Sequence, residues 1–156
     1  MICGKVAAGK STLAARLADA PMTILISEDH WTSRLYKEEM KTVADYARYS
    51  RRLRDAMGPH VEALLKAGLS VVLDFPANTP ANRQWMRGLF ETAGAAHCLH
   101  FLEVSDDVCK QRLRQRNAVG VHEFAVSDAE FDEITSYFVP PAAAEGFDVT
   151  VYRDAS

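Results

Sequence analysis

Short apolar runs alternate along the chain with longer segments in which apolar residues recur every three or four positions. The apolar runs have the length and composition expected of strands, and they lie at 22–26, 69–74, 97–104 and 147–152. Helical spacing or helix-capping residues mark the segments between them, at 10–18, 36–66, 79–93, 105–117 and 127–139. This alternation of strands and helices predicts an α/β fold with a mostly parallel sheet.

Two places in this pattern carry local signals for where a helix begins or breaks. Thr79 followed by Pro80 is typical of a helix start, because threonine caps the first turn and proline needs no amide partner there. The long region 36–66 contains Gly58 and Pro59, and a proline inside a helix removes a hydrogen bond and clashes with the preceding turn. We therefore expect this region to form two helical pieces.

The most specific motif of the chain begins at its fourth residue. Residues 4–11 read GKVAAGKS, which fits the phosphate-loop pattern G-x-x-x-x-G-K-[ST]. Gly4 and Gly9 allow backbone conformations and close approaches that a Cβ would prevent. In such a loop successive amides, here including those of Ala7 and Ala8, point inward and bind phosphate. The loop therefore predicts a nucleotide-binding site.

The residues that end the motif have separate expected roles. A helix beginning near Lys10 directs its positive dipole end at the phosphates, and the Lys10 ammonium reaches the β- and γ-phosphates. The Ser11 hydroxyl is the expected Mg²⁺ ligand, and Thr12 lies in the same turn. Only Met1 to Cys3 precede the loop, so the first strand is expected to be short.

Carboxylates follow the second and third expected strands, and the ends of neighbouring parallel strands open onto one crevice. Asp29 comes shortly after the second run, where it can accept the proton of an attacking hydroxyl or cap the next helix. Glu28 is a weaker candidate for the base. Asp74 ends the run VVLD, and we interpret it either as a Mg²⁺ ligand or as a contact to the acceptor.

Three arginines are candidates for binding phosphate or substrate. Arg83 lies near the start of the helix that follows the third strand, and we interpret it as an exposed residue that contacts phosphate or acceptor. Arg112 and Arg116 are four residues apart and therefore share one face of a helix. They precede an irregular segment, and we expect residues 117–127 to form a short lid. Arginines at this point would neutralise the phosphoryl group during its transfer.

Composition places a few further limits on the protein. The chain has 156 residues, the size of one domain, and its net charge of −3 creates no general attraction for nucleic acid or anionic membranes. No apolar stretch approaches the ~20 residues that span a bilayer, and no signal peptide pattern is present. We therefore expect a single domain over residues 1–156, cytoplasmic, without membrane association, and a monomer or weak dimer.

Taken in order, the segments GKVAAGKST, ISEDHW, VVLDFPANTPANR and CKQRLRQRN resemble those of a group of small P-loop kinases. The group includes polynucleotide 5′-hydroxyl kinase domains, zeta toxins and chloramphenicol phosphotransferase. The resemblance covers nearly the whole chain and implies a three-layer P-loop NTPase fold with a mostly parallel five-stranded sheet. It also implies ATP as the nucleotide, Asp29 as the base, and nucleotide contacts by Arg112 and Arg116.

The motifs and the resemblance together predict an ATP-dependent phosphotransferase that acts on the hydroxyl group of a small molecule. Its catalytic residues would be Lys10, Asp29 and Arg116. One alternative acceptor is a nucleotide or a polynucleotide 5′-hydroxyl, although polynucleotide kinases carry an arginine where this chain has Thr32. Another alternative, of a different class, is a nucleotide-binding switch or ATPase without an acceptor.

Overall fold

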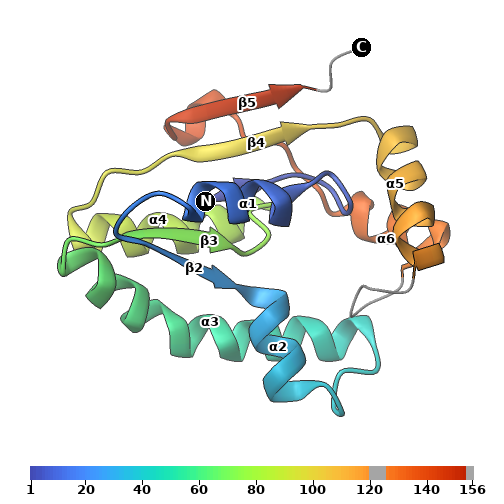
Figure 1. Cartoon of the computed structure of the whole chain (residues 1–156), viewed down its shortest axis with the longest axis horizontal. Coiled ribbons are helices and arrows are strands. Elements are labelled where there is room, and N and C mark those ends of the chain that lie inside the picture. The colour runs from blue at the N-terminus through green and yellow to red at the C-terminus, as the bar shows by residue number, and fades with distance from the viewer. Residues whose placement is uncertain (120–125, 154–156) are drawn as a thin grey trace.

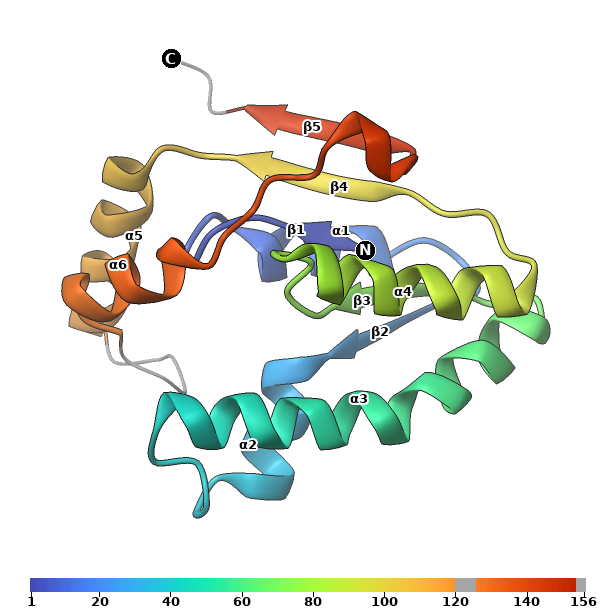
Figure 2. The ribbon, with the colours of Figure 1, turned by 180° about the vertical axis from the view of Figure 1, so that it is seen from behind.

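A computed structural model shows helices on both faces of a parallel sheet (Figure 1 and Figure 2). The structure describes residues 1–119 and 126–153. The strands in these residues are β1 (Ile2–Cys3), β2 (Thr23–Ser27), β3 (Ser70–Asp74), β4 (Leu99–Glu103) and β5 (Val149–Arg153). The α-helices are α1 (Lys10–Ala18), α2 (Glu28–Tyr36), α3 (Val43–Lys66), α4 (Pro80–Ala93), α5 (Asp106–Val119) and α6 (Asp128–Ser136).

Every strand pairing in the described residues is parallel. β2 pairs with β3, starting with Thr23 opposite Ser70, and β4 lies between β1 and β5. The strands thus form two hydrogen-bonded groups, β2-β3 and β1-β4-β5. Because β1 has only two residues, a single bridge between Ile2 and Pro76 is the pairing that joins the two groups in the described residues. The expected fold class is confirmed, with its five strands divided between a ladder of two and a ladder of three.

Alternate strand residues point to opposite faces of the sheet and belong to two separate cores. Val72 of β3 lies in a buried cluster with Leu13 of α1. Its neighbour Leu73 lies in a second cluster, with Leu53 of α3 and Met86 of α4. α1 is in front of the sheet in Figure 1, and α4 is in front of it in the reverse view of Figure 2. The sheet is therefore the middle of three layers.

α3 runs unbroken from Val43 to Lys66, so the expectation of two helical pieces is wrong. Pro59 is exposed, whereas Gly58 is buried and packs on α4, where an added Cβ would lie at an ordinary contact distance of 3.5 Å from Leu89 Cδ2. Pro59 has no amide hydrogen and so cannot form its helical hydrogen bond, but packing of α3 against α4 and β3 keeps the helix continuous there. Like the other helices in the described residues, α3 lacks the long apolar run needed to cross a membrane.

Residues 28–36 form α2, a helix that the apolar pattern did not predict. Its buried residues are polar, namely Glu28, Thr32 and Ser33. The Thr32 hydroxyl donates to the Glu28 carbonyl at 2.8 Å, which satisfies one of these groups within the helix. A helix with a polar buried face shows no hydrophobic periodicity, so tertiary contact with α3 decides its position.

Candidate active site

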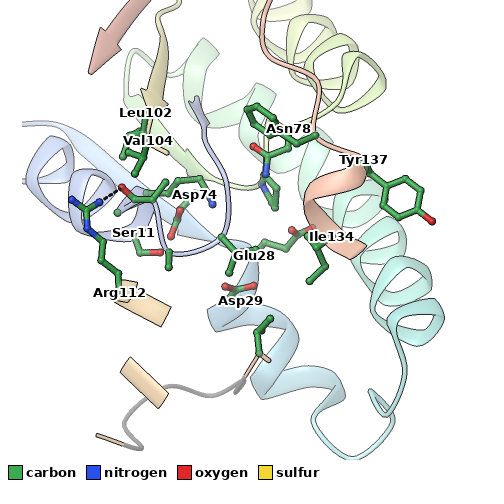
Figure 3. Close-up of a pocket in the computed structure, with 18 of the residues that line it drawn as sticks. Ser11, Glu28, Asp29, Asp74, Asn78, Leu102, Val104, Arg112, Ile134 and Tyr137 are labelled. Atoms are coloured by element: carbon green, nitrogen blue, oxygen red, sulfur yellow. Dashed lines mark hydrogen bonds between the residues drawn. The ribbon is translucent and has the colours of Figure 1, made fainter. Parts of the chain in front are cut away.

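A pocket of about 1260 Å³ opens where the carboxyl ends of the strands meet (Figure 3). In open α/β folds this is the usual place for a ligand. One side of the pocket is formed by the β1–α1 loop and α5, and the other by α2, the first half of α3, the loop after β3, and α6. The sequence-predicted residues that line it are Ala7, Ala8, Gly9, Lys10, Ser11, Thr12, Asp29, Asp74, Arg112 and Arg116.

The β1–α1 loop has the backbone shape of a phosphate nest. Ala7 and Gly9 have φ angles of 58° and 103°, in the left-handed region, which turns successive amides to one side. Gly4 allows a close approach, because an added Cβ would lie 3.2 Å from the Leu102 Cβ and 3.3 Å from the Leu102 carbonyl oxygen, tighter than most Cβ contacts. The Gly4 amide donates to Asn78 Oδ1 at 3.0 Å, which ties the loop to the chain after β3.

Lys10 folds its side chain back over this loop. Its Nζ donates to the carbonyl oxygens of Gly4 and Lys5 at 2.8 and 2.7 Å. Burial lowers the pKa of Lys10, and the negative charges of Asp74 and Asp29 oppose that shift. The Lys10 ammonium therefore lines the pocket and interacts electrostatically with the carboxylates of Asp74 and Asp29.

Ser11 and Asp74 face one another from the start of α1 and the end of β3 (Figure 3). The Ser27 hydroxyl donates to Asp74 Oδ2 at 3.4 Å and holds the carboxylate at the strand end. Hydroxyl and carboxylate oxygens are ligands that Mg²⁺ accepts, and the ion completes its shell with phosphate oxygens and water. These two residues fit a Mg²⁺ ion that is shared with a nucleotide.

Asp29 lies in the first turn of α2 and lines the pocket. The alternative in which Asp29 caps this helix is wrong, because Ser27 is the cap and accepts from the His30 amide at 3.4 Å. The hydroxyl of Tyr46, from α3, lies 3.4 Å from Asp29 Oδ1. The Asp29 carboxylate therefore has a neighbour that orients it inside the pocket.

A buried polar network next to Asp29 was not found from the sequence. Glu28, only 1% exposed, accepts hydrogen bonds from the hydroxyls of Tyr46, at 3.1 Å, and Ser50. Arg54 Nε lies 3.5 Å from Glu28 Oε1. Burial raises the pKa of Glu28, and the Ser50 hydrogen bond and the Arg54 charge act against that shift. Glu28 therefore anchors this side of the pocket.

Three members of the network, Tyr46, Ser50 and Arg54, are spaced four residues apart on α3 and share one face. Arg54 Nη1 also donates to Asn82 Oδ1 at 2.7 Å, which extends the network to α4. The polar stripe along α3 was the available signal in the sequence. Its partner Glu28 comes from another helix, so the spacing alone could not identify the network.

Arg112 and Arg116 of α5 both reach the pocket, as expected. Arg112 Nη1 donates to the Ala8 carbonyl in the phosphate loop at 3.3 Å (Figure 3). Burial lowers the pKa of Arg116, and the negative charge of Asp29 opposes that shift. Arg116 therefore lies close enough to the candidate base to interact with it electrostatically.

Arg83 does not line the pocket, so its interpretation as an exposed substrate contact is wrong. The residue is 0% exposed. Its Nε and Nη2 donate to the Glu145 carboxylate at 2.6 and 2.8 Å, and its Nη1 donates to the carbonyls of Ala77 and Val139 at 2.9 and 2.8 Å. These bonds join α4 to the segment that precedes β5, which is a structural role.

Residues 1–141 match the model of a protein family described as an AAA domain. The chain belongs to this family. Among curated proteins, none matches the sequence. Solved structures do match it, and they extend the comparison from the family to the fold.

The fold is that of small P-loop kinases. A protein from Chloroflexus aurantiacus J-10-fl, described as a candidate kinase, is 20% identical with a TM-score of 0.77, over 97% of this chain and 82% of its own. A gluconokinase from Sinorhizobium meliloti 1021 is 18% identical with a TM-score of 0.66, over 99% of this chain and 82% of its own. The APS kinase CysC of Mycobacterium tuberculosis, in complex with AMPPNP and APS, is 16% identical with a TM-score of 0.55, over 99% and 87%.

Proposed function

We propose that this member of the AAA domain family transfers the γ-phosphoryl group of ATP to a hydroxyl group of a small molecule. The observation that carries the proposal is one pocket that holds the phosphate loop, the Asp29 carboxylate and Arg116 together. The gluconokinase and APS kinase among the structural neighbours support a small-molecule acceptor. The phosphate loop alone would fit many nucleotide-binding proteins, whereas a carboxylate beside it fits proton removal from an acceptor.

In the proposed reaction the acceptor oxygen attacks the γ-phosphorus of ATP. A new bond forms between that oxygen and phosphorus, the bond from phosphorus to the β,γ-bridging oxygen breaks, and ADP leaves. Asp29 accepts the proton of the acceptor hydroxyl. Lys10 and Arg116 stabilise the negative charge on the oxygens of the phosphoryl group during transfer.

The remaining residues bind and orient the nucleotide. The amides of Ala7, Ala8 and Gly9 surround the phosphates, with Thr12 and Arg112 at the edge of the site, whereas the Gly4 amide is bonded to Asn78 and holds the loop in place. Mg²⁺, held by Ser11 and Asp74, would neutralise phosphate charge. Asp74 alternatively contacts the acceptor. Residues 117–127 are proposed as a lid that excludes water, and 120–125 of this segment lie outside the described residues.

A polynucleotide acceptor is less well supported. Of the basic stretch at 48–54, only Arg54 lines the pocket, and this arginine is paired with Glu28. Thr32, at the position of the polynucleotide-kinase arginine, is fully buried and donates to the Glu28 carbonyl. Neither residue provides a site for a nucleic-acid phosphate.

The test is the substitution Asp29→Asn, which removes the base and preserves the size of the side chain. We expect phosphoryl transfer to fall by about 100-fold or more, the usual range for general-base catalysis, with little change in ATP affinity. Transfer is measured as ATP-dependent mass gain by a library of hydroxyl compounds, and affinity by calorimetry with a non-hydrolysable ATP analogue. Transfer by Asp29→Asn at the wild-type rate contradicts the assignment of the base.

ATP hydrolysis in the absence of an acceptor separates the proposal from a nucleotide-dependent switch. Asp19→Asn, at an exposed position after α1 and outside the pocket, is the matched control. We expect this variant to retain wild-type transfer. A protein that hydrolyses ATP but never phosphorylates a hydroxyl compound contradicts the phosphotransferase proposal.

A further inference from the structure

The two sides of the pocket carry opposite charges. The cations that line the phosphate side are Lys10, Arg16, Arg112 and Arg116. The opposite side, which we name the acceptor side, has the charged lining residues Glu28, Asp29, Lys41, Arg54, Glu130 and Glu133. Among the residues that the structure describes, four carboxylates on this side stand against two cations; Asp74 and Arg153, at the ends of β3 and β5, also line the pocket, and Arg153 pairs with Glu103. An acceptor bound beside Asp29 would therefore meet a surface with an excess of negative charge.

The two cations of the acceptor side are unequal. Arg54 is bound to Glu28 and to Asn82, so its charge is already balanced by a buried carboxylate. Lys41 is exposed at the mouth of the pocket, where solvent screens its charge. The sequence from 117 to 127, which contains the proposed lid, has no lysine or arginine. Its one basic side chain is the imidazole of His122.

Part of the negative charge comes from one face of α6. Glu130, Glu133, Ile134 and Tyr137 all line the pocket, and their spacing of three and four residues places them on a single side of the helix. Glu130 is also held by the capping box with Ser127. Glu133 is thus the carboxylate of α6 that can be changed without removing the helix cap.

α6 is held in place at its middle and just beyond its C-terminal end. Phe131 is fully buried in the core, and Lys110 of α5 pairs with Asp132 at 2.6 Å. Just beyond the helix, the Val139 amide donates to the Asn78 carbonyl at 2.9 Å, in the loop after β3. The pocket-facing side of α6 is therefore a built wall of the acceptor side; Glu130 and Glu133 on it are exposed, as Lys41 is, so solvent screens their charges as well.

We infer that the acceptor is an uncharged or amine-bearing polyhydroxy compound, such as a sugar or an amino sugar, and that carboxylated and phosphorylated compounds are excluded. The inference rests on the proposed function and specifies its substrate class. The acceptor side also carries the uncharged polar residues Thr42, Asn78, Thr79 and Asn82, of which Thr42 and Thr79 cap helices and Asn82 bonds Arg54 and the Pro76 carbonyl. A carboxylate or phosphate on the acceptor would lie against like charges, a repulsion that selects against it.

The test uses matched sets of acceptors, each with one carbon skeleton in neutral, amino, carboxylate and phosphate forms. Glucose, glucosamine, gluconate and glucose 6-phosphate make one set, and pentose and disaccharide sets are tested in parallel. Transfer from ATP is measured by mass gain. We expect the neutral or amino member of a set to be phosphorylated at least about tenfold faster than its anionic members. Faster transfer to an anionic member overturns the inference, and so does transfer to no member by protein that binds ATP.

The variant Glu133→Lys tests the source of the selectivity. We expect the ratio of amino to carboxylate acceptor in kcat/KM to fall by about tenfold, with the KM for ATP unchanged. The matched control is Glu39→Lys, an exposed position between α2 and α3 that does not line the pocket. Equal ratios in Glu133→Lys and wild type overturn the role of the α6 charge. A wild-type protein that binds no ATP analogue contradicts the proposed function itself, which distinguishes the two failures.

Discussion

The phosphate side and the acceptor side of the pocket are constructed differently. The phosphate side comes mainly from one segment, residues 4–12, whose amides and left-handed turns form the binding surface. The acceptor side combines Glu28, Tyr46 and Asn82 with other residues of α2, α3 and α4, which are linked by side-chain hydrogen bonds. Phosphate can be bound by backbone groups that any sequence carries, whereas an acceptor is distinguished by side chains. Specificity is therefore expected to reside on the acceptor side.

The largest expected effect concerns the phosphate side. Lys10→Ala removes the ammonium that bonds the Gly4 and Lys5 carbonyls, and we expect nucleotide affinity or turnover to fall by about 100-fold or more. Calorimetry with an ATP analogue and an assay of ATP consumption measure the two quantities. Lys37→Ala, at an exposed turn outside the pocket, should have no effect. If Lys10→Ala keeps wild-type nucleotide affinity and turnover, the segment 4–12 is not the nucleotide-binding side of the pocket.

The next effect concerns stability, and it distinguishes a buried arginine from the pocket arginines. Arg83→Met leaves the Glu145 carboxylate and two carbonyls without their donor, so we expect a loss of about 3–5 kcal/mol in the free energy of unfolding. Urea denaturation measures this loss. The kcat/KM per folded molecule should stay at the wild-type value, because Arg83 is outside the pocket. If Arg83→Met has wild-type stability but a reduced kcat/KM, Arg83 contacts the substrate and does not have a structural role.

A smaller effect is expected within the acceptor side. Tyr46→Phe removes the hydroxyl that lies 3.1 Å from Glu28 and 3.4 Å from Asp29. We expect kcat to fall by about tenfold with the KM for ATP unchanged, because the base loses its orientation while the phosphate loop is intact. Tyr49→Phe, on the same helix but outside the pocket, is the control. A reduced ATP affinity in Tyr46→Phe would show that the two sides are not independent.

The smallest effect is a pH dependence of stability that differs between two glutamates. Burial raises the folded-state pKa of Glu28, so its contribution to stability is full at low pH and is lost as the pH rises through that value. The Arg83 hydrogen bond lowers the pKa of Glu145, whose contribution is present above its unfolded-state pKa and is lost on acidification.

Thermal denaturation between about pH 4 and about pH 7 tests both signs, since this range spans the ordinary pKa of glutamate. Relative to wild type, Glu28→Gln should gain melting temperature as the pH rises, by a few degrees. Glu145→Gln should lose melting temperature over the same range. If both differences move in the same direction, the two carboxylates do not have the opposed environments that the structure shows.

Local signals in the sequence identified several features correctly. Thr79 accepts from the Asn82 amide as the cap of α4, with Pro80 in the first turn. In the loop at residues 4–11, Gly9 has the left-handed backbone and Gly4 the close approach that the glycines were expected to allow. Asp29 and Asp74 both reach the pocket, because the ends of parallel strands meet at one edge of the sheet. Each of these features depends on a few neighbouring residues or on the direction of the strands.

Other features depended on contacts between distant parts of the chain and could not be predicted. α2 buries polar residues, and Pro59 lies inside an unbroken α3, because helix-to-helix packing outweighs local preference. Arg83 and Arg116 are both arginines near a helix end or start, yet the first is buried against Glu145 and the second lines the pocket. A single side chain does not specify which partner the fold will bring to it.

The sequence by itself therefore determined the α/β fold, the phosphate loop and the carboxylates at the strand ends. Their causes are local: backbone geometry at glycines, capping hydrogen bonds, and the shared direction of parallel strands. Only the tertiary structure decided that Glu28, Tyr46 and Arg54 form one network, and that α6 turns Glu133 toward the same pocket. These arrangements arise from packing between elements far apart in the chain, where the energy of a contact depends on both partners at once.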